Sequence, residues 1–192
     1  TLYRTGIDSQ VVAQLVEAAR AGKDVTAVVE LRARFHEDTH IRPASRLPEA
    51  GVQVVYGIVG HKAHAKMLMI VRRERRGIRR YVHLGTGNYH SGTAKLYTDI
   101  GLLTCQPEIG EDVQHVFQQL SGLGRVLKLQ RLLNSPFTLH KRLLKKIQRE
   151  AEHARAGRPA AIDAKMNSLT EPRIIRALYE ASQAGVPIRL VI

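Results

Sequence analysis

Two stretches of this chain, residues 11–29 and 174–192, match each other without a gap, and this match constrains the fold more than any other feature. Each has apolar residues at helical spacing, then a glycine, then a branched apolar run that is typical of a buried strand. Leucine, glutamate, alanine and glycine recur at equivalent places. We expect a second copy of the first domain to begin near the C-terminal end. The alternative, convergence of two amphipathic helix–strand units, stays open here.

The residues around the first copy predict strands that alternate with helices. Residues 8–22 are expected to form a helix capped by Asp8 or Ser9, and residues 23–34 a buried strand. A short helix and a strand are predicted over 45–59, a hairpin over 64–88 that turns at ERRG, and a strand at 99–105. A helix is predicted at 111–123, a linker at 133–137 and a basic helix from there to about Ala156. This order favours an α/β fold, a mixed sheet flanked by helices. We expect one domain over 1–132, then a linker helix and the truncated start of a second over 133–192.

The composition points to an anionic partner. Thirty Lys and Arg stand against 17 acids, which gives a net charge of +13. Nucleic acid, nucleotide, phosphate polymer and lipid headgroup all satisfy this charge. Aromatic residues make up only 5% of the chain and Trp is absent, so stacking platforms for single-stranded nucleic acid are poorly supplied. No apolar run approaches the length of a membrane span, and the lone Cys105 favours a reducing, cytoplasmic compartment. Peripheral association with an inner membrane stays open.

A histidine and a lysine stand two residues apart at the start of the predicted hairpin. In a strand His64 and Lys66 would share one face, about 6.6 Å apart along the chain. That spacing suits a phosphoryl group between an attacking imidazole and a neutralising ammonium. On the partner strand His83 precedes the tetrapeptide Gly85, Thr86, Gly87 and Asn88, whose backbone and side-chain donors could converge on an anion.

This pattern resembles the phospholipase D superfamily, with its His-x-Lys, a later Asp and a later Gly-Ser-x-Asn. One position departs from the superfamily, because Val71 stands where the Asp is expected, seven residues after His64. The departure argues against ordinary phosphodiesterase or nuclease chemistry.

A narrower resemblance covers essentially the whole chain. The stretches that carry it are TLYR (1–4), VVELRARF (28–35), HAKMLMI (64–70), YVHLGTGNYHSGTAKLYTDIGLLT (81–104) and AGVPIRLVI (184–192). In order and spacing they are similar to the C-terminal half of the ATP-dependent polyphosphate kinases that make long chains. The resemblance implies a phospholipase D-like α/β fold, and ATP, Mg²⁺ and inorganic polyphosphate as cofactors and partners. It also implies a homo-oligomer as the full-length protein, with no specific nucleic acid partner.

The resemblance also assigns roles to individual residues. His64 falls on the phosphorylated histidine, and His83 on a second histidine that acts as a general acid or phosphate ligand. Tyr97 matches a nucleotide-contacting tyrosine, and Arg4 and Arg34 match the magnesium–phosphate site. Guanidinium groups have no acceptor for a cation, so we expect both arginines to hold the phosphates that bind Mg²⁺. Lys66 and the 85–88 loop come from local geometry.

Three functions remain open from the sequence. The first is the catalytic half of a polyphosphate kinase, which transfers the ATP γ-phosphate reversibly through a phosphohistidine. The second is a phospholipase D-like phosphodiesterase or nuclease, and the third a non-catalytic anion-binding module. The incomplete second copy leads us to expect a fragment that is inactive alone. The sequence leaves the oligomeric state and the preferred direction of reaction open.

Overall fold

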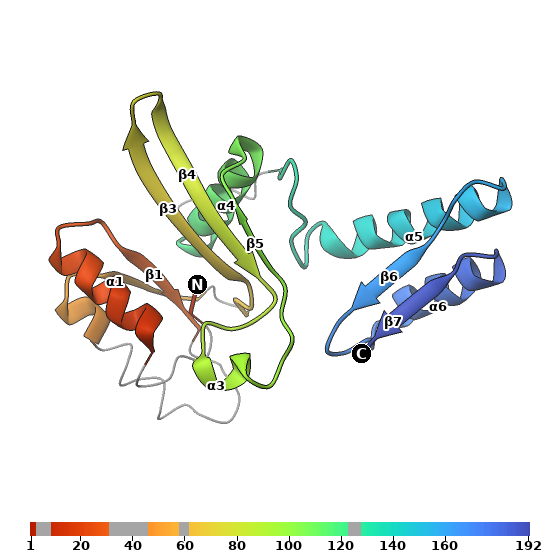
Figure 1. Cartoon of the computed structure of the whole chain (residues 1–192), viewed down its shortest axis with the longest axis horizontal. Coiled ribbons are helices and arrows are strands. Elements are labelled where there is room, and N and C mark those ends of the chain that lie inside the picture. Colours follow the sequence, from red (N-terminus) through yellow and green to blue (C-terminus); the bar gives the residue numbers. More distant parts are fainter. Residues whose placement is uncertain (3–8, 31–45, 58–61, 123–127) are drawn as a thin grey trace. The chain divides into compact units, whose positions relative to one another are not determined.

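A computed structural model describes residues 1–2, 9–30, 46–57, 62–122 and 128–192 (Figure 1). The described part of the chain divides into two compact units, Thr1–Leu132 and Leu133–Ile192. Each unit is described by itself below. Within the described residues, no helix combines the length and the apolar character that crossing a bilayer requires.

Unit one contains a parallel and an antiparallel set of strands. The parallel pair is β1 (Thr26–Val29) with β2 (Gln53–Tyr56). The antiparallel set has the order β3-β4-β5, with β3 Lys66–Glu74, β4 Gly77–Gly85 and β5 Gly101–Thr104. Its helices are α1 (Gln10–Arg20), α3 (Ser91–Ala94) and α4 (Pro107–Leu120), with a further helical turn at 46–49. The predicted hairpin forms, with its turn at ERRG.

Residues 1 and 2 join these two sets of strands. The backbone N–H of Leu2 donates to the Val28 carbonyl at 2.7 Å, and Leu2 forms a parallel bridge with Val29. On the other side, the amino group of Thr1 donates to the Met67 carbonyl at 2.7 Å. The start of β3 is therefore held beside the end of β1, which is where His64 and Lys66 enter the fold.

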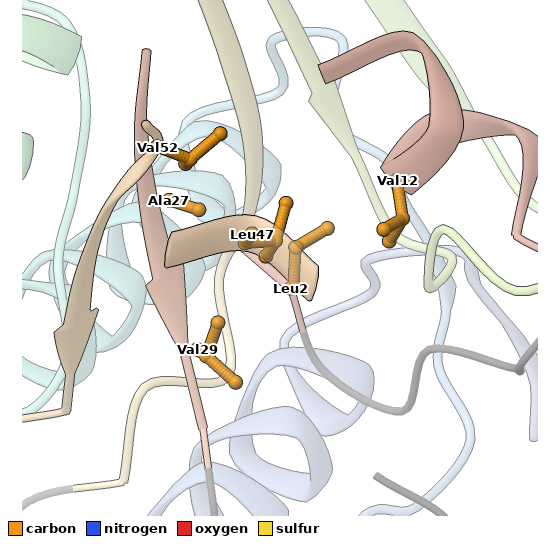
Figure 2. Close-up of a cluster of buried hydrophobic side chains, with 6 residues drawn as sticks. All are labelled: Leu2, Val12, Ala27, Val29, Leu47 and Val52. Atoms are coloured by element: carbon orange, nitrogen blue, oxygen red, sulfur yellow. The ribbon is translucent and has the colours of Figure 1, made fainter. Parts of the chain in front are cut away.

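The core of unit one lies between α1 and the parallel pair. Figure 2 shows one cluster of six buried side chains there, and all are apolar: Leu2, Val12, Ala27, Val29, Leu47 and Val52. The helix begins because the Ser9 hydroxyl accepts the Val12 N–H at 3.4 Å. It ends before Gly22, whose φ of 76° favours glycine. The N-cap and the glycine stop predicted from the sequence are both present.

Helix α4 packs on the face of β3 and β4 that carries Met67 and Val82, both buried. Arg80 on that face donates from Nε to Gln114 Oε1 at 2.6 Å. The helix begins at Pro107, four residues before the predicted start. The reason is that proline is favourable in the first helical turn, where its missing N–H has no intrahelical partner.

Unit two is a smaller α/β arrangement. It contains α5 (Leu139–Arg155), β6 (Ile162–Lys165), α6 (Pro172–Gln183) and β7 (Ile188–Val191). The two strands are parallel, and α5 and α6 pack against each other. The buried side chains of its core are Ile147, Ala151, Leu178, Ala181 and Val186.

The two matching stretches have the same backbone arrangement. Helix, glycine and strand recur as α6, Gly185 and β7, and Gly185 has a φ of 92°. The segment before each helix also pairs in parallel with the strand after that helix: β6 pairs with β7, and Leu2 forms a bridge with Val29 of β1. Met166 N–H donates to the Val191 carbonyl as Leu2 N–H donates to the Val28 carbonyl. Val28 and Val191 are equivalent in the sequence match. The shared pattern therefore extends beyond the helix–strand unit to its parallel neighbour.

Candidate functional site

His64 and Lys66 contact each other at the start of β3. The ammonium nitrogen Nζ of Lys66 lies 3.0 Å from both Nδ1 and Nε2 of His64. His64 is exposed, whereas Lys66 is only 7% exposed. The side chain of Lys66 is thus mostly buried, while its ammonium contacts the accessible imidazole of His64. The sequence predicted both residues in a strand, but β3 begins at Lys66, so His64 lies two residues before the strand.

A buried carboxylate holds the segment that carries His64. Glu30, directly after β1, is 6% exposed, and its Oε2 accepts the backbone N–H of Ala63 at 2.8 Å. The backbone N–H of Glu30 in turn donates to the Leu2 carbonyl at 3.1 Å. Hydrogen bonds to a charged acceptor are among the stronger ones in proteins. Glu30 thereby ties the residue next to His64 to the end of β1.

His83 lies on the same face of the sheet as Lys66. In the β3–β4 register Lys66 is opposite Gly85 and Leu68 is opposite His83. Directly opposed residues share a face, and residues two apart along a strand share it as well. Lys66 and His83 are therefore diagonal neighbours on this face, which is the one opposite α4. The structure thus places Lys66 in contact with His64 and on the same sheet face as His83.

The His83 imidazole is packed between a tyrosine and two glycines. Its Nδ1 lies 2.7 Å from the Tyr89 hydroxyl, and the two rings are tilted by 56°. Burial raises the pKa of Tyr89 to about 12, so its hydroxyl keeps its proton. A Cβ added to Gly101 would lie 2.8 Å from His83 Nε2, and one added to Gly85 would lie 3.1 Å from Cε1. Both glycines leave space for this ring.

We expect Gly101→Ala to destabilise the chain through His83. The added methyl would displace the imidazole, and overpacking of this kind lowers the free energy of unfolding by about 1–2 kcal/mol. Urea unfolding of the chain measures the change. In a His83→Ala background the methyl has room, so the same substitution should have little effect. An equal loss of stability in both backgrounds would contradict the packing we describe.

The 85–88 loop is held by an aspartate. The Thr86 hydroxyl donates to Asp99 Oδ1 at 2.9 Å and accepts the Ile100 N–H at 3.0 Å, while Thr86 N–H donates to the Ile100 carbonyl. A Cβ on Gly87 would clash with Asp99 Oδ2. These contacts occupy the Thr86 donors and place a negative charge at the loop. The structure therefore gives Thr86 and Gly87 a role in holding the loop.

Asn88 differs from the other loop residues. Its Oδ1 is buried and has no hydrogen-bond partner within the described residues. An unsatisfied buried acceptor is unfavourable, and such atoms are common where a ligand or water binds. Among the four loop residues, Asn88 keeps the strongest structural case for contact with a ligand.

The remaining predicted residues are Tyr97, Arg4, Arg34 and Cys105. Tyr97 is 59% exposed, so its ring is open to a stacking partner. Arg4 and Arg34 lie outside the described residues. The strand predicted at 99–105 would include Cys105, but β5 ends at Thr104 and Cys105 is partly exposed. Its sulfur accepts a hydrogen bond from Arg79 Nη2 at 2.9 Å.

Magnesium requires oxygen ligands such as carboxylates. In the described part of the chain, no three His, Cys, Asp or Glu residues are grouped closely enough to hold a metal ion. Asp99 is engaged by Thr86, and Glu30 by Ala63. The described residues therefore contain no cluster that could by itself supply three such ligands to Mg²⁺.

Sequence reasoning missed four residues that shape this site: Glu30, Tyr89, Asp99 and Gly101. All four lie in stretches that carry the family resemblance, and a lone acid at the end of a buried strand could have marked Glu30. Tyr89 and Asp99 act through contacts with residues six and thirteen positions away, on other elements. Gly101 lies opposite Gly85 because of the β4–β5 strand register, which cannot be predicted from a local sequence pattern.

Comparison with known proteins supports the sequence resemblance. Residues 1–126 match the family described as polyphosphate kinase C-terminal domain 1, and residues 132–192 match polyphosphate kinase C-terminal domain 2. A polyphosphate kinase of Xylella fastidiosa is 64% identical over the whole chain, and one of Pseudomonas aeruginosa is 59% identical. The chain spans 28% of the length of each of these curated relatives.

A solved structure has the same fold. The crystal structure of polyphosphate kinase from Porphyromonas gingivalis matches 98% of this chain with a TM-score of 0.86 at 34% identity, and the match covers 32% of that chain. This confirms the predicted phospholipase D-like α/β fold, with sheets flanked by helices.

Proposed function

The chain belongs to the polyphosphate kinase family, and we propose that it forms the histidine-bearing catalytic part of such an enzyme. In this proposal the γ-phosphate of ATP passes reversibly to a growing polyphosphate chain through a phosphohistidine at His64. The observation that carries it is the exposed His64 imidazole with the Lys66 ammonium at 3.0 Å, on the sheet face that also holds His83. Val71 stands where a phosphodiesterase of the superfamily has its Asp.

The proposed reaction has two balanced steps. A ring nitrogen of His64 donates its electron pair to the γ-phosphorus, a P–N bond forms, and the P–O bond to ADP breaks with its electron pair on ADP. A terminal oxygen of polyphosphate then attacks the same phosphorus, the P–N bond breaks, and the imidazole is regenerated. Reversal of both steps would make ATP from ADP.

Lys66 supports both steps by its charge. An ammonium has donors and no acceptor, and the Lys66 ammonium lies 3.0 Å from both ring nitrogens of His64. In a neutral imidazole, the nitrogen without a proton can accept from it and carries the free electron pair. This is the form of imidazole that can attack phosphorus. When a phosphoryl group enters, the same ammonium can donate to its oxygens and neutralise the charge that develops.

His83, Asn88 and Tyr97 complete the proposed site. His83 would donate to a phosphate oxygen or protonate a leaving oxygen, with Tyr89 keeping its ring in place. Asn88 brings a buried carbonyl oxygen without a partner in the described structure, together with an amide that can donate. The exposed Tyr97 ring would stack on the adenine base.

Magnesium and quaternary structure remain part of the proposal by family resemblance. Arg4 and Arg34 would hold the phosphates that bind Mg²⁺, and we derive no step through the ion. We propose that residues 1–132 are the first phospholipase D-like domain and that residues 133–192 begin a second. The longer protein is expected to form homo-oligomers.

The test is the chemical identity of the phosphorylated residue. These 192 residues replace the matching segment of the Xylella fastidiosa relative, and the chimera is incubated with ATP that carries a radiolabelled γ-phosphate. We expect a label that is lost in acid and stable in base, as phosphohistidine is, and that maps to the peptide containing His64. Acid-stable label, or label on another peptide, would contradict the proposal.

A further inference from the structure

The outer half of the β3–β4 hairpin concentrates positive charge. Six arginines and a single glutamate lie between positions 72 and 80. We call Arg72, Arg73, Arg75 and Arg76 the arginine arm, and all four are exposed. Strand β5 pairs only with Val82–Gly85 of β4, so the turn end of the hairpin extends past the third strand. Figure 1 shows this turn and α3 at opposite ends of the sheet.

The register makes this charge unfavourable for the hairpin itself. Arg72 lies directly opposite Arg79, and like charges opposed across two strands are destabilising. Glu74 offers limited relief, because its Oε1 accepts the Tyr81 hydroxyl at 2.6 Å and Oε2 lies 3.8 Å from Arg79 Nη1. Within the described residues, the four arginines of the arm make no salt bridge. A like-charge pair that lowers the stability of its own hairpin is expected where the surface has a function.

The chemistry of the arm fits a polymer of phosphates. Guanidinium forks match phosphate oxygens and stay charged at any working pH. Residues 71–80 contain no aromatic side chain on which a base could stack, so inorganic polyphosphate is favoured over single-stranded nucleic acid. Arg72 lies on the same sheet face as Lys66, because even-numbered residues of β3 share a face. From Lys66 to Glu74 the strand is about 27 Å long.

We propose that the arginine arm is a second binding site for the polyphosphate chain, remote from His64. This rests on the proposed function, which supplies polyphosphate as the substrate. Long chains span the distance from His64 to the arm and gain its contacts, whereas tripolyphosphate is too short to reach both. The arm therefore makes affinity depend on chain length without taking part in phosphoryl transfer.

The test compares two variants that each remove four positive charges. The arm variant changes Arg72, Arg73, Arg75 and Arg76 to Gln. The control changes Lys141, Arg142, Lys145 and Lys146 of α5 to Gln; these are also exposed and without a salt bridge in the described structure. Fluorescence anisotropy measures binding of labelled long-chain polyphosphate, tripolyphosphate and single-stranded DNA to the chain at several salt concentrations.

We expect the arm variant to bind long-chain polyphosphate at least about tenfold more weakly. The slope of log affinity against log salt should become shallower by about 3, because each lost phosphate contact removes roughly 0.7. Binding of tripolyphosphate should stay the same, and the α5 control should change far less. The unfolding midpoint of the arm variant should be unchanged or raised, since the like-charge repulsion is removed.

Three results would overturn the arm as a polyphosphate site: equal losses in both variants, equal losses for long and short chains, or equally tight and equally arm-dependent binding of DNA. A separate readout tests the proposed function. In the Xylella fastidiosa chimera, the arm variant should keep phosphoryl transfer to tripolyphosphate. A chimera that transfers no phosphate while the arm still binds polyphosphate would refute the catalytic proposal and leave the binding site standing.

Discussion

Changing His64 to glutamine is expected to abolish phosphoryl transfer, lowering the rate by roughly four orders of magnitude or more. Glutamine can still accept a hydrogen bond from Lys66, but it has no nitrogen that can attack phosphorus and form the intermediate. Because the nucleophile takes part in both steps, synthesis of polyphosphate and regeneration of ATP should be lost together. Both rates are measured in the chimera with the Xylella fastidiosa relative, alongside the labelling of the protein.

A matched substitution separates this chemistry from a general loss of histidine. His153 lies in the last turn of α5, in the unit that holds none of the proposed site residues, so His153→Gln should leave both rates nearly unchanged. His64 is exposed, so His64→Gln should also leave the unfolding midpoint in urea unchanged. Substantial transfer by a folded His64→Gln chimera would refute the phosphohistidine mechanism.

Changing Asp112 to alanine should produce the largest loss of stability, about 4 kcal/mol in the free energy of unfolding. The carboxylate is fully buried in α4 and accepts the backbone N–H groups of Gln130, Arg131 and Leu132 at 2.7–3.1 Å. Removing it leaves three donors without their partner, each worth about 1–3 kcal/mol. Urea unfolding of the chain, followed by circular dichroism, measures the change.

The same carboxylate makes stability depend on acid pH. Burial alone would raise the pKa of Asp112, but the three backbone N–H donors outweigh burial and hold the pKa below its usual value. A carboxyl whose pKa is lower in the folded state stabilises the protein above the unfolded pKa of about 3.9. This contribution is lost as pH falls below that value through the folded pKa.

A control for Asp112 keeps the shape of the side chain and removes the charge. Asp112→Asn retains one acceptor, but its amide turns donors toward the backbone N–H groups, so we expect a loss that is clear but smaller than that of alanine. Near neutral pH both variants should be less stable than the parent, and the difference should shrink toward pH 3. A difference that stays constant with pH would contradict the charge-assisted contact.

Much of the secondary structure was predictable because it depends on local patterns. Ser9 caps α1 and Gly22 follows it, as the sequence indicated, and the hairpin turns at ERRG. The predicted start of α4 was wrong. The apolar pattern was counted from Glu111, but proline is favourable in a first helical turn and the helix begins at Pro107. The predicted end of the strand at Cys105 was wrong by one residue, because β5 ends at Thr104 and Cys105 accepts a hydrogen bond from Arg79 instead.

The pairing of His64 with Lys66 was also predictable, because two residues of spacing in an extended segment put both side chains on one face. The environment of His83 was not. Tyr89 approaches it from beyond the loop, and Gly101 faces it from another strand. Anion binding by residues 85–88 stays a prediction. The contact of Asp99 with Thr86 and its closeness to Gly87, thirteen and twelve positions away, were not predictable from a local pattern.

The sequence by itself determined the alternating strands and helices, the repeated helix–glycine–strand unit and the histidine beside a lysine. These features depend on hydrophobic period, turn chemistry and short-range spacing, which act over a few neighbouring residues. Which strands are neighbours, which glycine faces His83 and which carboxylate anchors a distant backbone were decided by tertiary structure. Those contacts depend on strand register and on long-range packing, which follow from the burial of the whole core and not from any one segment.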